Sequence, residues 1–93
     1  MRAYRVSLTP AVETALATLH PEIKRAVRNA LEAIASDPKI GMPLGGELTG
    51  LNRYKVRRFR IVYEIVPAQH VVRVVAIGHR RDIYEDLVGE RRR

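Results

Sequence analysis

The chain has 93 residues, of which 46% are hydrophobic and 29% are charged, and it contains no cysteine. This length accommodates one domain, residues 1–93, and excludes the large barrel enzymes and two-domain dinucleotide enzymes. The composition is typical of a globular protein and too apolar for intrinsic disorder. Without cysteine the chain can form neither a disulfide framework nor a thiolate zinc site, so we expect a protein of a reducing compartment, the cytoplasm.

Membrane insertion and export are not expected. The sequence has no run of 18 apolar residues, and residues 1–10 lack the apolar stretch of a signal peptide. The charge favours a polyanionic partner, because the formal net charge is +7. Residues 1–52 carry six basic and five acidic side chains, whereas residues 53–93 carry eleven and five. A basic surface that is merely solvated is the alternative.

The first half of the chain predicts a strand followed by two amphipathic helices. Apolar and polar side chains alternate over residues 4–8, which is typical of a half-buried strand. A Thr-Pro pair at residues 9–10 is typical of a helix start, and an apolar stripe continues from there to about Leu19. Residues 20–21 begin a second helix, which the Asp-Pro pair at residues 37–38 ends. Helices linked this closely predict an antiparallel hairpin that buries its stripes on another layer.

A three- to four-stranded antiparallel sheet is expected to supply that layer, which makes the domain α+β. Glycines and a proline within residues 41–50 predict a surface loop. Residues 54–66 predict a hairpin, and residues 71–77 are an almost continuous apolar run, as in an interior strand. Residues 82–88 are compatible with a short strand or a helical turn, and residues 89–93 predict a charged tail.

The hairpin gathers basic residues on one face of this sheet. With Arg58 and Phe59 as the turn, Arg57 pairs with Arg60 across the strands, and Lys55 shares their face. On the apolar face the same register pairs Val56 with Ile61 and Tyr54 with Tyr63. Like charges that face each other destabilise a sheet by up to about 1 kcal/mol, so we expect these residues to bind something.

The motifs of several enzyme classes are missing from the sequence. There is no phosphate-binding P-loop, no dinucleotide fingerprint, no zinc-protease motif and no serine-hydrolase elbow. The histidines at positions 20, 70 and 79 have no accompanying carboxylate cluster, so we expect neither metal nor cofactor. The remaining chemistry-bearing set is Lys55, Arg57, Arg60, His79, Arg80, Arg81 and Tyr84. Such a set suits phosphate chemistry without metal, and a phosphate-binding patch without catalysis is the alternative.

Three segments carry a more specific pattern. They are Y-K-V-R at residues 54–57, R-I-V-Y-E-I at residues 60–65 and A-I-G-H-R-R-D-I-Y-E at residues 76–85. In the last segment a strand ends in glycine, basic residues follow at once, and a tyrosine comes shortly after. Together the segments resemble the RelE/ParE toxin superfamily of bacterial toxin-antitoxin modules. The resemblance covers nearly the whole chain and implies a RelE-like fold.

In the RelE branch of this superfamily the toxin enters the ribosomal A site and cleaves mRNA. The resemblance implies catalytic roles for Lys55, Arg57, Arg60, Arg80 and Tyr84. We further expect Arg58, His79 and Arg81 to contact RNA. The implied reaction is attack of the mRNA 2′-hydroxyl on the adjacent phosphate, which gives a 2′,3′-cyclic phosphate and a 5′-hydroxyl without any cofactor.

Individual roles in that reaction follow from the chemistry of the side chains. Arginine does not release its proton in a protein, so Lys55 is the candidate base. The arginines of the catalytic set would hold the phosphate, and Tyr84 would stack on the nucleotide or orient it. The resemblance favours Arg80 as the group that protonates the leaving oxygen. Histidine titrates close to neutral pH, so His79 is the alternative.

Membership of this superfamily implies a cognate antitoxin and hence a toxin-antitoxin hetero-oligomer, with mRNA and the ribosome as further partners. Two alternatives stay open. One is a toxin of the ParE branch, whose members lack most of the basic set and poison DNA gyrase by binding. The spacings from Arg57 to Arg60 and from Gly78 to Tyr84 are shorter than in the RelE branch, which keeps this alternative in play. The other is a non-toxic basic RNA-binding module.

Overall fold

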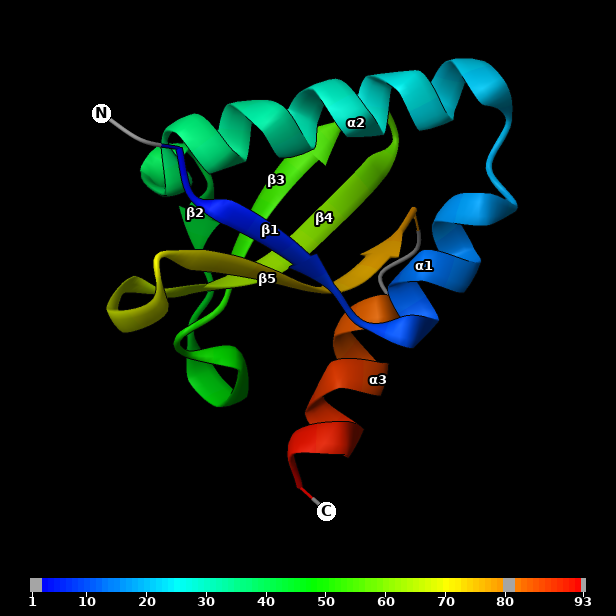
Figure 1. Cartoon of the computed structure of the whole chain (residues 1–93). Coiled ribbons are helices and arrows are strands. Elements are labelled where there is room, and N and C mark those ends of the chain that lie inside the picture. The colour runs from blue at the N-terminus through cyan, green and yellow to red at the C-terminus, as the bar shows by residue number, and fades with distance from the viewer. Residues whose placement is uncertain (1–2, 80–81, 93) are drawn as a thin grey trace.

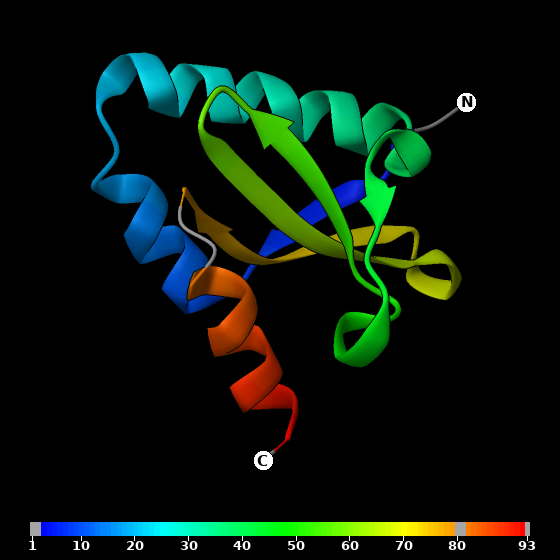
Figure 2. The same cartoon turned by 180° about the vertical axis from the view of Figure 1, so that it is seen from behind.

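The computed structural model describes residues 3–79 and 82–92. A five-stranded sheet in the order β1-β5-β4-β3-β2 lies at its centre, with helices on both faces (Figures 1 and 2). In chain order the elements are β1 (Arg5–Leu8), α1 (Pro10–Ala17), α2 (Pro21–Ser36), β2 (Met42–Pro43), β3 (Asn52–Val56), β4 (Phe59–Val66), β5 (Val71–Gly78) and α3 (Asp82–Arg91). Short 3-10 helices occur at Pro38–Ile40, Gly46–Leu48 and Pro67–Gln69.

Both predicted N-terminal helices are confirmed, and each begins at a capping side chain. Thr9 Oγ1 accepts a hydrogen bond from the Val12 amide at 3.3 Å, and His20 Nδ1 accepts one from the Glu22 amide at 3.3 Å. Each cap satisfies an amide that the helix leaves without a partner. The helices form an open hairpin, in which α1 packs against β5 while α2 crosses the sheet (Figure 1).

Two hydrophobic clusters hold the layers together, one on each face of the sheet. On the α2 face, fully buried side chains of the helix meet those of the sheet, among them Val27 and Ile34 against Ile61 and Val72. On the other face Leu87 of α3 packs in a cluster with Leu48, Leu51 and Val62. Helices therefore cover both faces of the sheet, and part of the β3–β4 hairpin stays exposed beside them.

The hairpin is confirmed, but the predicted turn is wrong by one residue. Arg57 and Arg58 form the turn, and Phe59 is the first residue of β4. Lys55 therefore faces Arg60, whereas the sequence predicted that Arg57 would. The apolar pairs also differ, because Val56 faces Phe59, Tyr54 faces Ile61 and Asn52 faces Tyr63. Two physical features accompany this register: Arg57 takes a left-handed φ of 56°, and Phe59 packs edge-on against His79.

The sheet differs from the predicted antiparallel sheet at both edges, although the strand predicted over residues 4–8 is present as β1. The N-terminal strand β1 pairs in parallel with β5, so the sheet is mixed. The glycine-rich loop contributes a two-residue edge strand, β2, which pairs with the start of β3. Of the two structures offered for residues 82–88, the helix is the observed one, and α3 continues to Arg91. Two residues are too few to show the alternation that reveals a strand, which is why β2 escaped prediction.

A buried tyrosine fixes the loop that precedes β2. Tyr63 is fully buried, and its hydroxyl donates to the Pro38 carbonyl at 2.7 Å and accepts from the Gly41 amide at 3.1 Å. A Cβ added at Gly41 would collide with that hydroxyl and lie 2.8 Å from the Arg53 carbonyl oxygen. Gly41 is therefore needed for close approach of the loop to the sheet.

We expect Tyr63→Phe to lower the free energy of unfolding by about 1 to 3 kcal/mol, because it removes the hydroxyl that pairs with the buried Pro38 carbonyl and the partly buried Gly41 amide. Burial raises the pKa of Tyr63 above its ordinary value of 10.0. The unfolded chain therefore releases this proton first, and the stability that the neutral hydroxyl provides is lost as the pH rises above 10.0. Urea titrations should show a steeper loss of stability above this pH for the wild type than for Tyr63→Phe.

Candidate nucleic-acid interface

Three residues form a basic row across one end of the sheet. Lys55 of β3 faces Arg60 of β4, and Arg60 faces Gly78 of β5. His79 follows directly, and its backbone carbonyl accepts a hydrogen bond from Arg60 Nη1 at 3.5 Å. We call Lys55, Arg60 and His79 the basic row. The sheet register thus brings Lys55 and Arg60 of the hairpin to the end of β5, although Arg60 and His79 lie far apart in the sequence.

Among the side chains described for residues 3–79 and 83–92, no ion pair involves the basic row. Ion pairs there join Arg73 to Glu64 and Arg92 to Glu47, away from the row. Lys55 is exposed, whereas Arg60 is half-buried, and its Nε atom is buried without a hydrogen-bond partner among the described residues. A guanidinium N–H that is shielded from water and unpaired costs free energy, which an anion bound at the row would recover.

An aromatic contact orients the end of the row. The rings of Phe59 and His79 lie edge to face, with centroids 5.3 Å apart and planes at 61°. The imidazole is exposed and is held against Phe59, whose side chain alternates with that of Arg60 along β4 and therefore lies on the other face of the sheet. Phe59 is not among the site residues predicted from the sequence, because it was expected to lie in the turn, whereas it begins β4.

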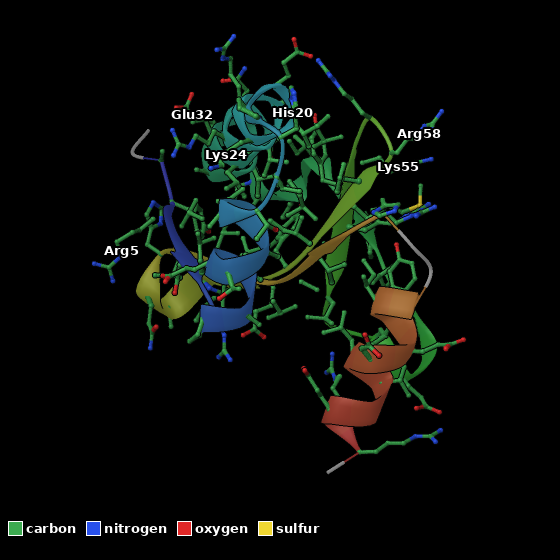
Figure 3. All side chains as sticks on the ribbon, turned by 90° about the vertical axis from the view of Figure 1, so that its right-hand side faces the viewer. Arg5, His20, Lys24, Glu32, Lys55 and Arg58 are labelled. Atoms are coloured by element: carbon green, nitrogen blue, oxygen red, sulfur yellow. The ribbon has the colours of Figure 1, made fainter. Side chains whose placement is uncertain are left out.

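The two arginines of the turn lie outside the basic row. In Figure 3 the labelled side chains of Lys55 and Arg58 extend from the hairpin on the side of α3, away from Arg5. Arg57 instead lines a hollow with residues of α2. The prediction that Arg57 shares the face of Lys55 and Arg60 is therefore wrong, because Arg57 belongs to the turn and no longer follows the alternation of the strand.

Tyr84 lies on α3 and packs against the cluster of Leu48, Leu51, Val62 and Leu87, which we call the second hydrophobic cluster. It is half-buried and lines a hollow with Met42 and Leu44 of the β2 segment and Arg53 of β3. Its hydroxyl is buried and has no hydrogen-bond partner among the residues that the structure describes. The predicted positions Arg80 and Arg81 lie outside the described residues.

Gly78 brings α3 close to the basic row. A Cβ added at this position would collide with Ile83 Cγ2, so only glycine lets the first turn of α3 approach the end of β5. Gly78 also faces Arg60 across the strands. The residue that lets α3 approach the end of β5 therefore lies next to the basic row.

We expect Gly78→Ala to lower the free energy of unfolding by about 1 to 3 kcal/mol through overpacking. Ile83→Ala in the same chain makes room for the new methyl group, so the double variant should be more stable than the sum of the two single effects predicts. Gly89→Ala is the matched control in α3, because nothing lies within 4 Å of a Cβ there. Additive effects in urea titrations would contradict the steric explanation.

The described residues show neither a metal-binding cluster nor a membrane-spanning helix. They contain no group of three or more His, Cys, Asp or Glu side chains placed to hold a metal ion. None of the described helices is both long enough and apolar enough to cross a membrane.

Comparison with known proteins gives the class of this fold. The toxin-antitoxin complex RelBE2 of Mycobacterium tuberculosis contains a similar chain, with 28% identity and a TM-score of 0.79, covering 86% of this chain and 94% of that one. The isolated E. coli RelE toxin is 21% identical with a TM-score of 0.74, covering 95% and 98%. The archaeal RelE-RelB complex from Pyrococcus horikoshii is 21% identical with a TM-score of 0.69, covering 85% and 98%. The chain thus has the fold of a toxin of a toxin-antitoxin module.

The family follows from the sequence. Residues 6–84 match the family described as ParE toxin of type II toxin-antitoxin system, parDE, and the chain belongs to this family. No curated protein sequence matches the chain. Membership confirms the resemblance to the RelE/ParE superfamily and identifies the protein as a toxin of a type II toxin-antitoxin module.

Proposed function

We propose that this toxin cleaves mRNA in the ribosomal A site, with the basic row as the centre of the reaction. The observation that carries the proposal is the direct pairing of Lys55 with Arg60, in which Arg60 Nε is shielded from water and unpaired among the described residues. A proton acceptor next to a guanidinium that lacks an anion is the arrangement that phosphodiester cleavage requires.

The reaction would proceed on the side chains of the row. Lys55 would act as the general base and take the proton of the 2′-hydroxyl as the oxygen of that hydroxyl forms a bond to phosphorus. Arg60 would hold the phosphate oxygens and the charge that develops on them. The bond from phosphorus to the 5′-oxygen breaks, and that oxygen takes a proton from His79 or Arg80. The products are a 2′,3′-cyclic phosphate and a 5′-hydroxyl, and the chain needs no cofactor for either step.

The remaining contacts belong to the same proposal. Arg58 and Arg81 would bind RNA beside the row, and Tyr84 would stack on or orient the nucleotide. A cognate antitoxin would hold the toxin inactive in a hetero-oligomer in the cytoplasm. The similar chains from Mycobacterium tuberculosis and Pyrococcus horikoshii occur in complexes of toxin with antitoxin, which supports this partner.

A second candidate function is inhibition of DNA gyrase by binding. The match of residues 6–84 to the ParE toxin family favours it. Under this alternative the basic residues bind without chemistry, and cells that express the toxin keep their mRNA intact.

Mapping of mRNA 5′ ends after brief expression without antitoxin distinguishes the two functions. RNA cleavage predicts new 5′-hydroxyl ends within translated codons. Cleavage by purified, EDTA-treated toxin should also persist once the magnesium that the ribosome needs is restored. Gyrase inhibition predicts intact mRNA, double-strand DNA breaks and loss of supercoiling. Normal growth of the expressing cells would contradict both and favour a non-toxic RNA-binding module.

A further inference from the structure

A second polar surface lies at the tip of the β3–β4 hairpin, outside the basic row. Arg57 of the turn and Arg25 and Asn29 of α2 line one hollow, together with Glu22 and Ala26. The four α2 residues recur at the three- and four-residue spacing that puts them on one face of the helix. Arg25, Asn29 and Arg57 are all exposed, and the ion pairs found among the described residues do not include either arginine. We call Arg25, Asn29 and Arg57 the tip site.

The backbone at Arg57 is a second, independent observation. Its φ of 56° lies in the left-handed region, where glycine or asparagine is favoured and other side chains are strained. A two-residue turn would ordinarily be filled by such residues. An arginine at this position has a conformational cost without a stabilising ion pair in the described chain, which indicates a role for its side chain in binding. The same turn places Arg57 at the hollow beside α2.

We propose that the tip site is a second contact for the RNA backbone, and that Arg57 is a binding residue rather than a catalytic one. The inference rests on the proposed function, since it extends the path of the same RNA. Two guanidinium groups and an amide on different elements are donors that suit phosphate oxygens. Glu22 in the hollow repels a small free anion, so the ligand must be a polyanion that is also held elsewhere. A single strand that passes the exposed Arg58 reaches both the basic row and the tip site.

Binding of a fluorescent 2′-O-methyl RNA oligonucleotide, measured by anisotropy over a range of salt concentrations, tests the tip site without cleavage. Such RNA has no free 2′-hydroxyl to attack the phosphate. Each lost phosphate contact on a single strand lowers the slope of log affinity against log salt by about 0.7. Arg25→Ala and Arg57→Ala should each show this loss. Between 50 and 200 mM salt the RNA affinity of the wild type should therefore fall by a factor about 2.6 times larger than the RNA affinity of either variant.

Three further variants separate binding from a structural role. Glu22→Gln should tighten binding, because it removes the one carboxylate found among the described residues that line the hollow, whereas loss of structure would weaken it. Arg57→Gly should lose the contact yet melt at the same or a higher temperature, because glycine accepts the left-handed turn. Arg5→Ala is the control, since Figure 3 shows Arg5 on the side of the molecule away from Lys55 and Arg58.

The outcomes for the tip site and for RNA cleavage are distinguishable. Unchanged salt slopes in both arginine variants, or no binding by the wild type, would overturn the tip site even if mRNA is cleaved. The expected slopes in a protein that cleaves no mRNA would overturn the proposed reaction and leave the tip site standing. In cleavage assays Arg57→Ala should raise KM and leave kcat unchanged. A fall in kcat with normal binding would return Arg57 to the catalytic residues and overturn the inference.

Discussion

Lys55→Ala is expected to reduce mRNA cleavage by about 100- to 10,000-fold, the usual contribution of a general base. The fold should persist, because Lys55 is exposed and its removal relieves the repulsion with Arg60 on the neighbouring strand. Rates of 5′-end formation with purified ribosomes measure the loss, and urea titration measures the stability. Toxicity in cells should disappear together with cleavage.

Two companion variants sharpen this test. Lys55→Arg keeps the positive charge but supplies no base, so it should bind RNA and fail to cleave it. Lys39→Ala is the matched control, because Lys39 is an exposed lysine outside the basic row. A Lys55→Arg protein that cleaves at the wild-type rate would show that Lys55 acts only through its charge and would remove the general base from the proposed reaction.

Tyr84→Ala is expected to lower the free energy of unfolding by about 2 to 3 kcal/mol, less than for a fully buried aromatic residue because Tyr84 is half-buried. The lost ring packs against the second hydrophobic cluster, whose buried members are Leu48, Leu51, Val62 and Leu87. Thermal melting should register the change as a fall of about 4 to 8 °C for each kcal/mol in a domain of this size. Assays well below that melting temperature then report the chemistry alone.

Tyr84→Phe separates the ring from its hydroxyl. Because the hydroxyl is buried without a partner among the described residues, its removal should leave stability unchanged or raise it slightly. Stacking on a nucleotide predicts that Tyr84→Phe cleaves normally and that folded Tyr84→Ala is impaired. Normal cleavage by folded Tyr84→Ala would assign the tyrosine to the second cluster alone and remove it from the site.

Local chemistry made the helices and interior strands predictable. Thr9 and His20 each precede a proline, which favours the start of a helix, and in the structure both residues are helix caps. The alternation in the hairpin predicted the two faces of the sheet correctly, although the turn was misplaced. A shift of the turn by one residue moves each cross-strand pair by two positions, so every strand residue stays on its face.

The site was less accessible to sequence reasoning where it depends on geometry between elements. The basic row depends on the register of three strands. Because the turn was misplaced by one residue, Arg57 was predicted as the partner of Arg60, whereas the observed partner is Lys55. The signal for the true turn was weak, because neither Arg57 nor Arg58 is a residue that turns favour. The α2 side of the hairpin tip has no signature in the sequence at all, since Arg25 and Asn29 look like an ordinary solvated helix face.

The parallel pairing of β1 with β5 has a consequence for the timing of assembly. It joins residues 5–8 to residues 71–74, so the sheet depends on contacts between segments that are far apart in the chain. Contacts of such high sequence separation slow folding. During synthesis the N-terminal strand must wait unpaired until β5 has left the ribosome. Arg60 meets Gly78 on that same strand, so a nascent chain has no complete basic row before the sheet itself can close.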